Sequence, residues 1–204
     1  MSDFCTVTDI ENFLQDWTIH TDAGKLASAQ DAIKTATSAI KNYCHQEIEQ
    51  SIETITLDCS GGYKLFLPEL PVVSVATVIE DGVVLVVTDD YKLGQHGILH
   101  RVDDEWAEGI QIVEVTYTHG YATIPDDVVG VCTRAASRAY QAGLAAAAVG
   151  GVAGVSSVTL GDYSFSLGTG AGGGAGEGVM GASGARLLLL SEKDILNKYR
   201  YVAL

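Results

Sequence analysis

The stretch VEVTYTHGYATIPDDVVG, residues 113–130, decides the fold class because it changes from strand to helix within a few residues. Its first half alternates apolar and polar side chains, which is the period of a half-buried strand. Gly120 then allows a turn that other residues resist. Pro125 is favoured at the first position of a helix, and Asp126 and Asp127 suit the positive N-terminus of that helix. The stretch therefore predicts a strand followed closely by a helix, and so an α+β protein.

Helices are predicted before and after this point. The run Thr8 to Glu11 fits a capping box and predicts a helix over residues 9–16. A second helix is expected over 22–46, and a third runs from 125 to 148 and is rich in alanine. Apolar residues recur every three or four positions in the second helix and predict one buried face, made of Leu26, Ala29, Ile33, Ala36, Ile40 and Tyr43.

Residues 51–121 are predicted to form a β-rich insertion between the second and third helices. Asp81-Gly82 separates two apolar runs, which is a strong hairpin signal. The short strand over 63–67 ends at Pro68, and proline lacks the amide that a central strand needs, so this strand is expected at an edge or turn. Further strands are predicted at 51–59, 72–80, 83–87, 91–93, 98–101 and 110–117.

The C-terminal quarter has a different composition. Fourteen of the 23 glycines fall between residues 143 and 184. We expect a core over 1–150 and an extended C-terminal arm over 151–204: a strand pair around Gly161-Asp162, a flexible glycine-rich linker, and a helix from Ser191 to Tyr199 with Ser191 and Asp194 at its cap. The predicted fold is thus a small helical bundle with a β-rich insertion and a Gly-rich arm.

The charge balance excludes some classes of function. Twelve Lys and Arg against 26 Asp and Glu give a formal net charge of -14. Phosphate neutralisation needs clustered cations, so an ordinary nucleic-acid binder is excluded, as is attraction to an anionic membrane surface. No signal peptide or membrane span is predicted. The four cysteines have no paired spacing and are expected to be free, mostly buried thiols rather than zinc ligands.

Sites for catalysis, cofactors and metals are not predicted. The glycine run lacks the Lys of a phosphate loop and has too many glycines in a row for the helix start that a dinucleotide site needs. His96 and His100 lie in a predicted turn and strand rather than on a helix, and the acids of residues 103–108 are expected to form a solvated face. The best candidate for a catalytic base is His119 together with this acidic cluster, but the sequence shows no nucleophile or orienting acid for it.

Three patterns in order give a resemblance to a known family. They are residues 67–75 followed by the Asp81-Gly82 turn, residues 113–128, and residues 160–166 followed by a helix ending at Arg200. Together they resemble the head–tail connector (adaptor, head-completion) proteins of long-tailed bacteriophages. The resemblance spans most of the chain, and the second pattern is the most specific. The insert between Gly168 and Gly184 departs from the family's pattern.

The resemblance implies a structural protein and no enzyme. It implies a homo-oligomeric ring, usually of about twelve copies, at the portal vertex of the virion, with assembly in the host cytoplasm. Its partners would be the portal protein and a stopper or other tail-side connector protein. Double-stranded DNA would pass without tight binding, since an acidic lumen repels phosphates. Alternatives that stay open are another connector layer (stopper or tail completion), a general binding module and a small cytosolic enzyme.

The residues expected at interfaces are apolar or lie in the arm. A tether that ends in four leucines needs a surface on which to bury them, and a tethered strand can add to a partner's sheet. The predicted interface residues are Leu160, Tyr163, Phe165, Leu187, Leu188, Leu189, Leu190, Tyr199 and Arg200.

Overall fold

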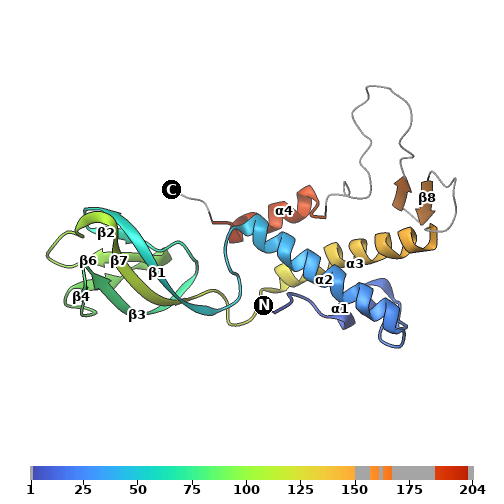
Figure 1. Ribbon diagram of the computed structural model, residues 1–204, viewed down its shortest axis with the longest axis horizontal. Helices are drawn as coiled ribbons and strands as arrows, with labels where there is room; N and C mark the ends of the chain where they lie inside the picture. The colour runs from blue at the N-terminus through green and yellow to red at the C-terminus, as the bar shows by residue number, and fades with distance from the viewer. Residues whose placement is uncertain (1, 150–156, 161–162, 167–186, 202–204) are drawn as a thin grey trace, which may run out of the picture. The chain divides into compact units, whose positions relative to one another are not determined.

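The computed structural model describes residues 2–149, 157–160, 163–166 and 187–201. Its contacts divide the chain into two compact units (Figure 1). The helical unit comprises Asp3–Ile40 and Asp127–Ile195, and the β unit comprises Lys41–Asp126 and Leu196–Leu204. The β unit is thus an insertion between helices, as predicted. A boundary after residue 150 stays a prediction, because residues 150–156 lie outside the described residues.

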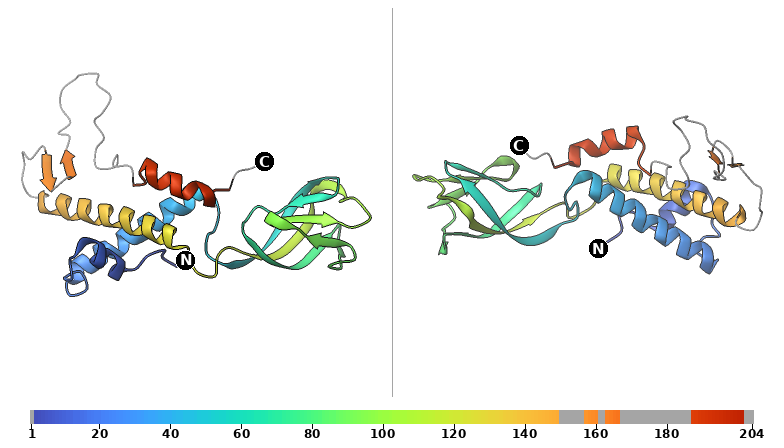
Figure 2. Two further views of the ribbon diagram at one scale, coloured as in Figure 1. Left: turned by 180° about the vertical axis from the view of Figure 1, so that it is seen from behind. Right: turned by 45° about the horizontal axis from the view of Figure 1, so that its top comes forward.

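The helical unit is built on α1 (Val7–Leu14), most of α2 (Ala23–Cys44) and of α3 (Asp126–Val149), and most of α4 (Leu190–Leu196). These helices gather into one small bundle in all the views (Figures 1 and 2). None of the helices in the described ranges is long and apolar enough to cross a membrane.

Helix α1 begins two residues before the predicted start, because a different capping box forms. The Thr6 side chain accepts a hydrogen bond from the Asp9 amide at 3.2 Å, and the Asp9 carboxylate accepts one from the Thr6 amide at 2.7 Å. Thr8 and Glu11 therefore lie inside the helix. Glu11 is buried and binds His20, with 2.7 Å between its carboxylate and Nδ1.

The predicted apolar face of α2 is the face that packs. Ala29, Ile33, Ala36 and Ile40 are all almost completely buried, whereas Leu26 and Tyr43 are half-buried. In α3 the buried positions again recur at three and four: Val128, Val131, Cys132, Ala135, Ala136 and Tyr140. The small side chains of the N-terminal half of α3 thus serve the core of the helical unit.

The β unit contains two antiparallel sheets. The first has the order β1-β7-β3-β4, formed by β1 (Ser51–Ser60), β7 (Glu108–His119), β3 (Val72–Glu80) and β4 (Val83–Val84). The second has the order β2-β6-β5, formed by β2 (Lys64–Phe66), β6 (Ile98–Arg101) and β5 (Tyr91–Leu93), with a 3-10 turn η1 (Gln95–Gly97) before β6. Strand β2, which precedes Pro68, lies at an edge, as its proline predicts.

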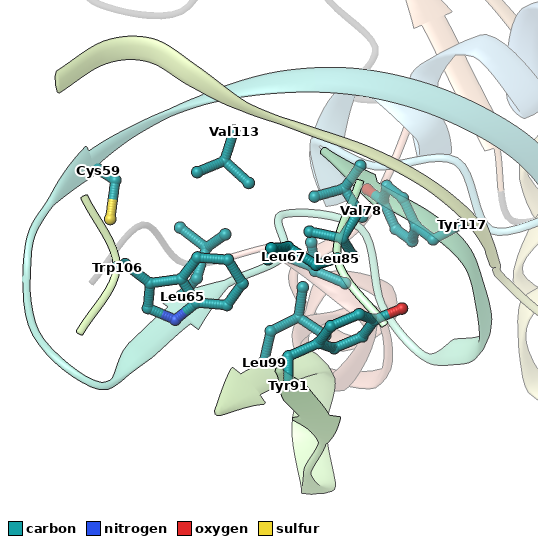
Figure 3. Packing of buried hydrophobic residues seen from close by; sticks show 11 residues of the cluster. Cys59, Leu65, Leu67, Val78, Leu85, Tyr91, Leu99, Trp106, Val113 and Tyr117 are labelled. Atoms are coloured by element: carbon teal, nitrogen blue, oxygen red, sulfur yellow. The ribbon is translucent and has the colours of Figure 1, made fainter. Parts of the chain in front are cut away.

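The core of the β unit lies among these strands (Figure 3). Val113, Val115 and Tyr117 of β7 are fully buried, and the residues between them are not. The predicted alternation is therefore confirmed from residue 113 onward. Ile110 falls outside it and is 84% exposed, because the chain takes a positive φ at Gln111 and the alternation restarts after it.

Two predicted turns have the backbone that their residues allow. Asp81 and Gly82 both take positive φ between β3 and β4, as a two-residue hairpin turn requires. Gly120 has φ of +86°, and a Cβ there would lie 2.5 Å from the Glu49 carbonyl oxygen. Glycine at position 120 is thus needed both for its φ and for close approach to the backbone before β1.

The arm contains the predicted strand pair and helix. Strands β8 (Ser157–Leu160) and β9 (Tyr163–Ser166) pair antiparallel, and α4 continues into a 3-10 turn, η2 (Asn197–Tyr199). The cap of α4 differs from the prediction: the Glu192 carboxylate accepts the Leu189 amide at 2.9 Å, and Ser191 and Asp194 lie inside the helix. The predicted linker, Gly168 to Gly178, lies outside the described residues.

Candidate functional site

His119, the seed of the enzyme hypothesis, does not have the geometry of a catalytic base. It is completely buried at the end of β7, and burial lowers its pKa. Its Nε2 lies 3.2 Å from the Ser51 hydroxyl and 3.5 Å from the Glu53 carboxylate. A catalytic base needs the nucleophile on one ring nitrogen and an orienting acid on the other. Here both groups lie at Nε2, and Nδ1 has no hydrogen-bond partner among the described residues.

The acidic cluster cannot assist His119. Asp103, Asp104, Glu105 and Glu108 are exposed, as expected of a solvated acidic face. Glu108 begins β7 and His119 ends it, so at about 3.3 Å per residue the two lie roughly 36 Å apart along the strand. Within the described ranges, no group of three or more His, Cys, Asp or Glu side chains could hold a metal ion.

The η2 turn near the C-terminus is held by contacts with other residues of the β unit. Gln46 donates a side-chain hydrogen bond to the Tyr199 carbonyl, and its amide oxygen accepts the Leu70 amide at 3.2 Å. Tyr199, a predicted interface residue, is buried with its ring edge-on to Tyr121. Arg200, also predicted, is exposed.

These contacts border a shallow hollow in the β unit. Its volume is about 360 Å³, and it lies between the η1 turn, the loop before β3 and the η2 turn. Pro71, Val72, Tyr121 and Tyr199 give it an apolar wall. Gln46, Gln95, His96 and Lys198 also line it, so its lining is mixed polar and apolar.

The four leucines of 187–190 do not share one environment. Leu188 is buried within the helical unit at 7% exposure, and Leu187 is half-buried. Leu189 and Leu190 are 44% and 68% exposed. Only the last two therefore present a large apolar surface that a partner could cover.

A buried ion pair fixes this segment. Arg138 of α3 donates to both carboxylate oxygens of Glu192, at 2.8 and 2.5 Å, and to the Leu187 carbonyl at 2.8 Å. The Glu192 side chain is 4% exposed. Bidentate pairs of this kind set geometry as well as energy, so Arg138 and Glu192 determine which leucines face outward.

The other predicted interface residues lie in β8 and β9. Leu160 ends β8, and Tyr163 and Phe165 belong to β9, where they pair with Leu160 and Val158. Their side chains lie outside the part that the structure describes. Their role at an interface stays a prediction.

Sequence reasoning missed an exposed apolar surface in the β unit, which we name the valine patch. It comprises Val83, Val84, Val86 and Val87, each between 54% and 63% exposed, around the buried Leu85. Five apolar residues in a row were the available signal. An extended chain can turn only alternate side chains to one core, so such a run at a sheet edge must expose some of them.

The chain matches a known protein family over more than half of its length. The family model described as head completion protein matches residues 3–133. Among solved structures, a chain in the neck of an empty gene transfer agent particle, computed with C6 symmetry, is 17% identical with a TM-score of 0.49, covering 87% of this chain and 80% of that one. A chain in the neck of a native gene transfer agent particle, computed with C12 symmetry, is 15% identical with a TM-score of 0.48, covering 100% and 96%. No curated protein matches.

Proposed function

The chain belongs to the head completion protein family, and from this membership we propose that it is a structural virion protein that joins the capsid portal to the tail as a ring. The family match over residues 3–133 is the observation that carries the proposal. It covers the helices α1 and α2, residues 41–126 of the β unit and the start of α3, so it includes a large part of each compact unit. We propose no enzymatic activity.

Ring assembly requires two different surfaces on each subunit. A heterologous interface joins one patch to another patch of the next copy, and the ring closes when the rotation closes. The exposed apolar side chains of the described residues include the valine patch in the β unit and the pair Leu189 and Leu190 in the helical unit, and each could serve as such a surface. We propose that both are covered in the assembled ring, and that Leu160, Tyr163, Phe165 and Arg200 of the arm add to the contacts.

The charge of the chain suits a conduit for DNA. A net charge of -14 repels phosphates, so DNA can pass without being held. Asp103, Asp104, Glu105 and Glu108 form an exposed acidic edge on the β unit. We propose that acids of this kind face passing double-stranded DNA in the virion neck.

The proposed partners follow from the position in the neck. The portal protein would lie on the capsid side, and a stopper or another tail-side connector protein on the other side. Assembly would take place in the host cytoplasm. The alternative is a connector layer one step further from the portal, which would share the ring but not the portal contact.

Native mass spectrometry of the purified chain over a range of concentrations tests the ring. We expect a single closed species of about twelve copies at high concentration, or a monomer that forms this ring when portal protein is added. A stable dimer or tetramer that ignores the portal would contradict the proposal. Addition of the stopper alone, without the portal, distinguishes the two connector layers by which protein captures the chain.

A further inference from the structure

Two thiols from distant parts of the chain meet in the helical unit. The Sγ atoms of Cys5 and Cys132 lie 3.2 Å apart although 127 positions separate them in sequence. Cys5 belongs to the segment before α1, and Cys132 lies on α3. Both are buried and free. The other cysteines, Cys44 and Cys59, belong to the β unit.

The surroundings hold this pair in place. Phe4 is buried, and its amide donates to the Thr37 hydroxyl of α2 at 3.2 Å. The same hydroxyl lies 3.7 Å from the Cys132 sulfur. The segment before α1 is therefore fixed against α2 and α3 at the position of the thiols.

The two sulfurs are also chemically different. Cys5 donates its thiol hydrogen to Cys132, and this bond together with Thr37 lowers the pKa of Cys132 despite burial. The same bond and burial raise the pKa of Cys5. Because the thiolate is the nucleophile, Cys132 is the thiol that reacts first and Cys5 the one that resolves.

We propose that Cys5 and Cys132 form a redox pair, which a peroxide converts to an intramolecular disulfide that fastens the segment before α1 to α3. The geometry carries this proposal, since the two sulfurs need little movement to reach bonding distance. The bond stays open in a reducing cytosol and closes when the protein meets an oxidising medium.

The reaction balances with hydrogen peroxide as the oxidant. The Cys132 thiolate attacks one peroxide oxygen, the O–O bond breaks, and the hydroxide released takes up a proton to become water; Cys132 is now a sulfenic acid. The Cys5 sulfur then attacks the Cys132 sulfur, and the S–O bond breaks. The departing hydroxide takes the Cys5 proton and leaves as a second water. Two thiols lose two electrons, and one peroxide gains them.

The consequence is a large covalent loop. A cross-link between residues 127 positions apart removes much of the freedom of the unfolded chain. We expect the oxidised protein to unfold at a midpoint about 10 °C above that of the reduced protein. Release of a virion from a reducing cell would then stabilise the subunit against unfolding. This consequence for the virion rests on the proposed function, whereas formation of the disulfide does not.

Peptide mapping of the full chain tests the proposal directly. Purified reduced protein is treated with a small excess of hydrogen peroxide, alkylated under denaturing conditions and digested with trypsin. Cys5 and Cys132 fall in separate tryptic peptides, residues 1–25 and 102–134, whereas Cys44 and Cys59 share residues 42–64. We expect a linked pair of the first two peptides, alkylated Cys44 and Cys59, and full reversal by dithiothreitol.

Two variants control the chemistry. Cys5→Ser should leave a sulfenic acid on Cys132 that dimedone traps, with no gain in thermal midpoint on oxidation. Cys44→Ser should behave as the wild type, with the linked peptide and the higher midpoint. Three results would each overturn the proposal. The first is that all four thiols are still alkylated after treatment, and the second is that Cys132 of the wild type is oxidised beyond the sulfenic acid without the linked peptide. The third is that disulfides form only between chains. The mapping needs no variant, so a poorly folded mutant does not affect it.

Discussion

Replacing Glu192 with Ala should release the C-terminal segment from the helical unit. In the wild type the Glu192 carboxylate accepts two hydrogen bonds from Arg138 and one from the Leu189 amide, and it lies 3.6 Å from the Arg134 guanidinium. The substitution removes all of these at once. It leaves the Arg138 side chain, which is only 17% exposed, with its charge uncompensated.

The size of the effect follows from burial. Removing one partner of a buried ion pair costs about 3–5 kcal/mol, mainly because the other charge stays buried. The Leu189 amide also loses its acceptor, but Leu189 is 44% exposed, so we expect that group to add little. Partial access to Arg138 favours the lower limit of about 3 kcal/mol, which corresponds to a roughly hundredfold increase in the open population of α4.

Limited trypsin digestion at Lys193, inside α4, measures this population, since cleavage of a rapidly opening segment follows its equilibrium. We expect Glu192→Ala to be cut about a hundredfold faster than the wild type. Ser191→Ala, an exposed position on the same helix that does not flank the cleaved bond, is the matched control and should be cut at the wild-type rate. Equal rates for the two variants would refute the assignment of Glu192 as the group that holds α4.

Three further changes have expected outcomes. Leu190→Asp should leave the thermal midpoint almost unchanged but prevent ring formation in native mass spectrometry. Leu188→Asp should instead lower the midpoint strongly, because only Leu188 is buried. Equal midpoints for the two variants would contradict this. Gly120→Ala should cost about 3 kcal/mol in urea unfolding, and Gly82→Ala about 1 kcal/mol, because both have positive φ but only a Cβ at 120 meets backbone. Burial lowers the pKa of His119, so the unfolded chain binds more protons and stability falls as pH drops below 6.5; His119→Gln should flatten this slope, and an unchanged slope would show that His119 does not titrate on unfolding.

The enzyme hypothesis shows how tertiary geometry decides between residues that are close in sequence. His119 and the acids of 103–108 are near neighbours along the chain, and composition alone leaves them as a possible acid–base group. The extended backbone of β7 keeps them at opposite ends of the sheet. A helix over the same residues would have brought them to about half that distance, since its rise per residue is about half that of a strand.

Local patterns determined most of the secondary structure. Alternation in residues 113–119, the Asp81-Gly82 turn, Pro125 and the apolar face of α2 each act through neighbours in sequence, so their predictions were confirmed. The two helix caps were wrong, at Thr8 and at Ser191, because several residues in a row can cap and only the backbone selects one. The three patterns taken together, residues 67–75, residues 113–128 and residues 160–166 with the helix ending at Arg200, gave the resemblance to the family, and the family model matches residues 3–133, which contain the first two.

Only the tertiary structure decided which apolar residues are left for partners. Leu188 and Leu190 belong to the same run of four leucines, and nothing in the sequence distinguishes them. Leu188 is buried and Leu190 is exposed because Arg138, far away on α3, fixes the direction of the segment through Glu192. Cys5 and Cys132 likewise have no spacing that marks them as a pair. Burial and long-range pairing are properties of a packed core, in which the partners come from segments that the local sequence does not specify.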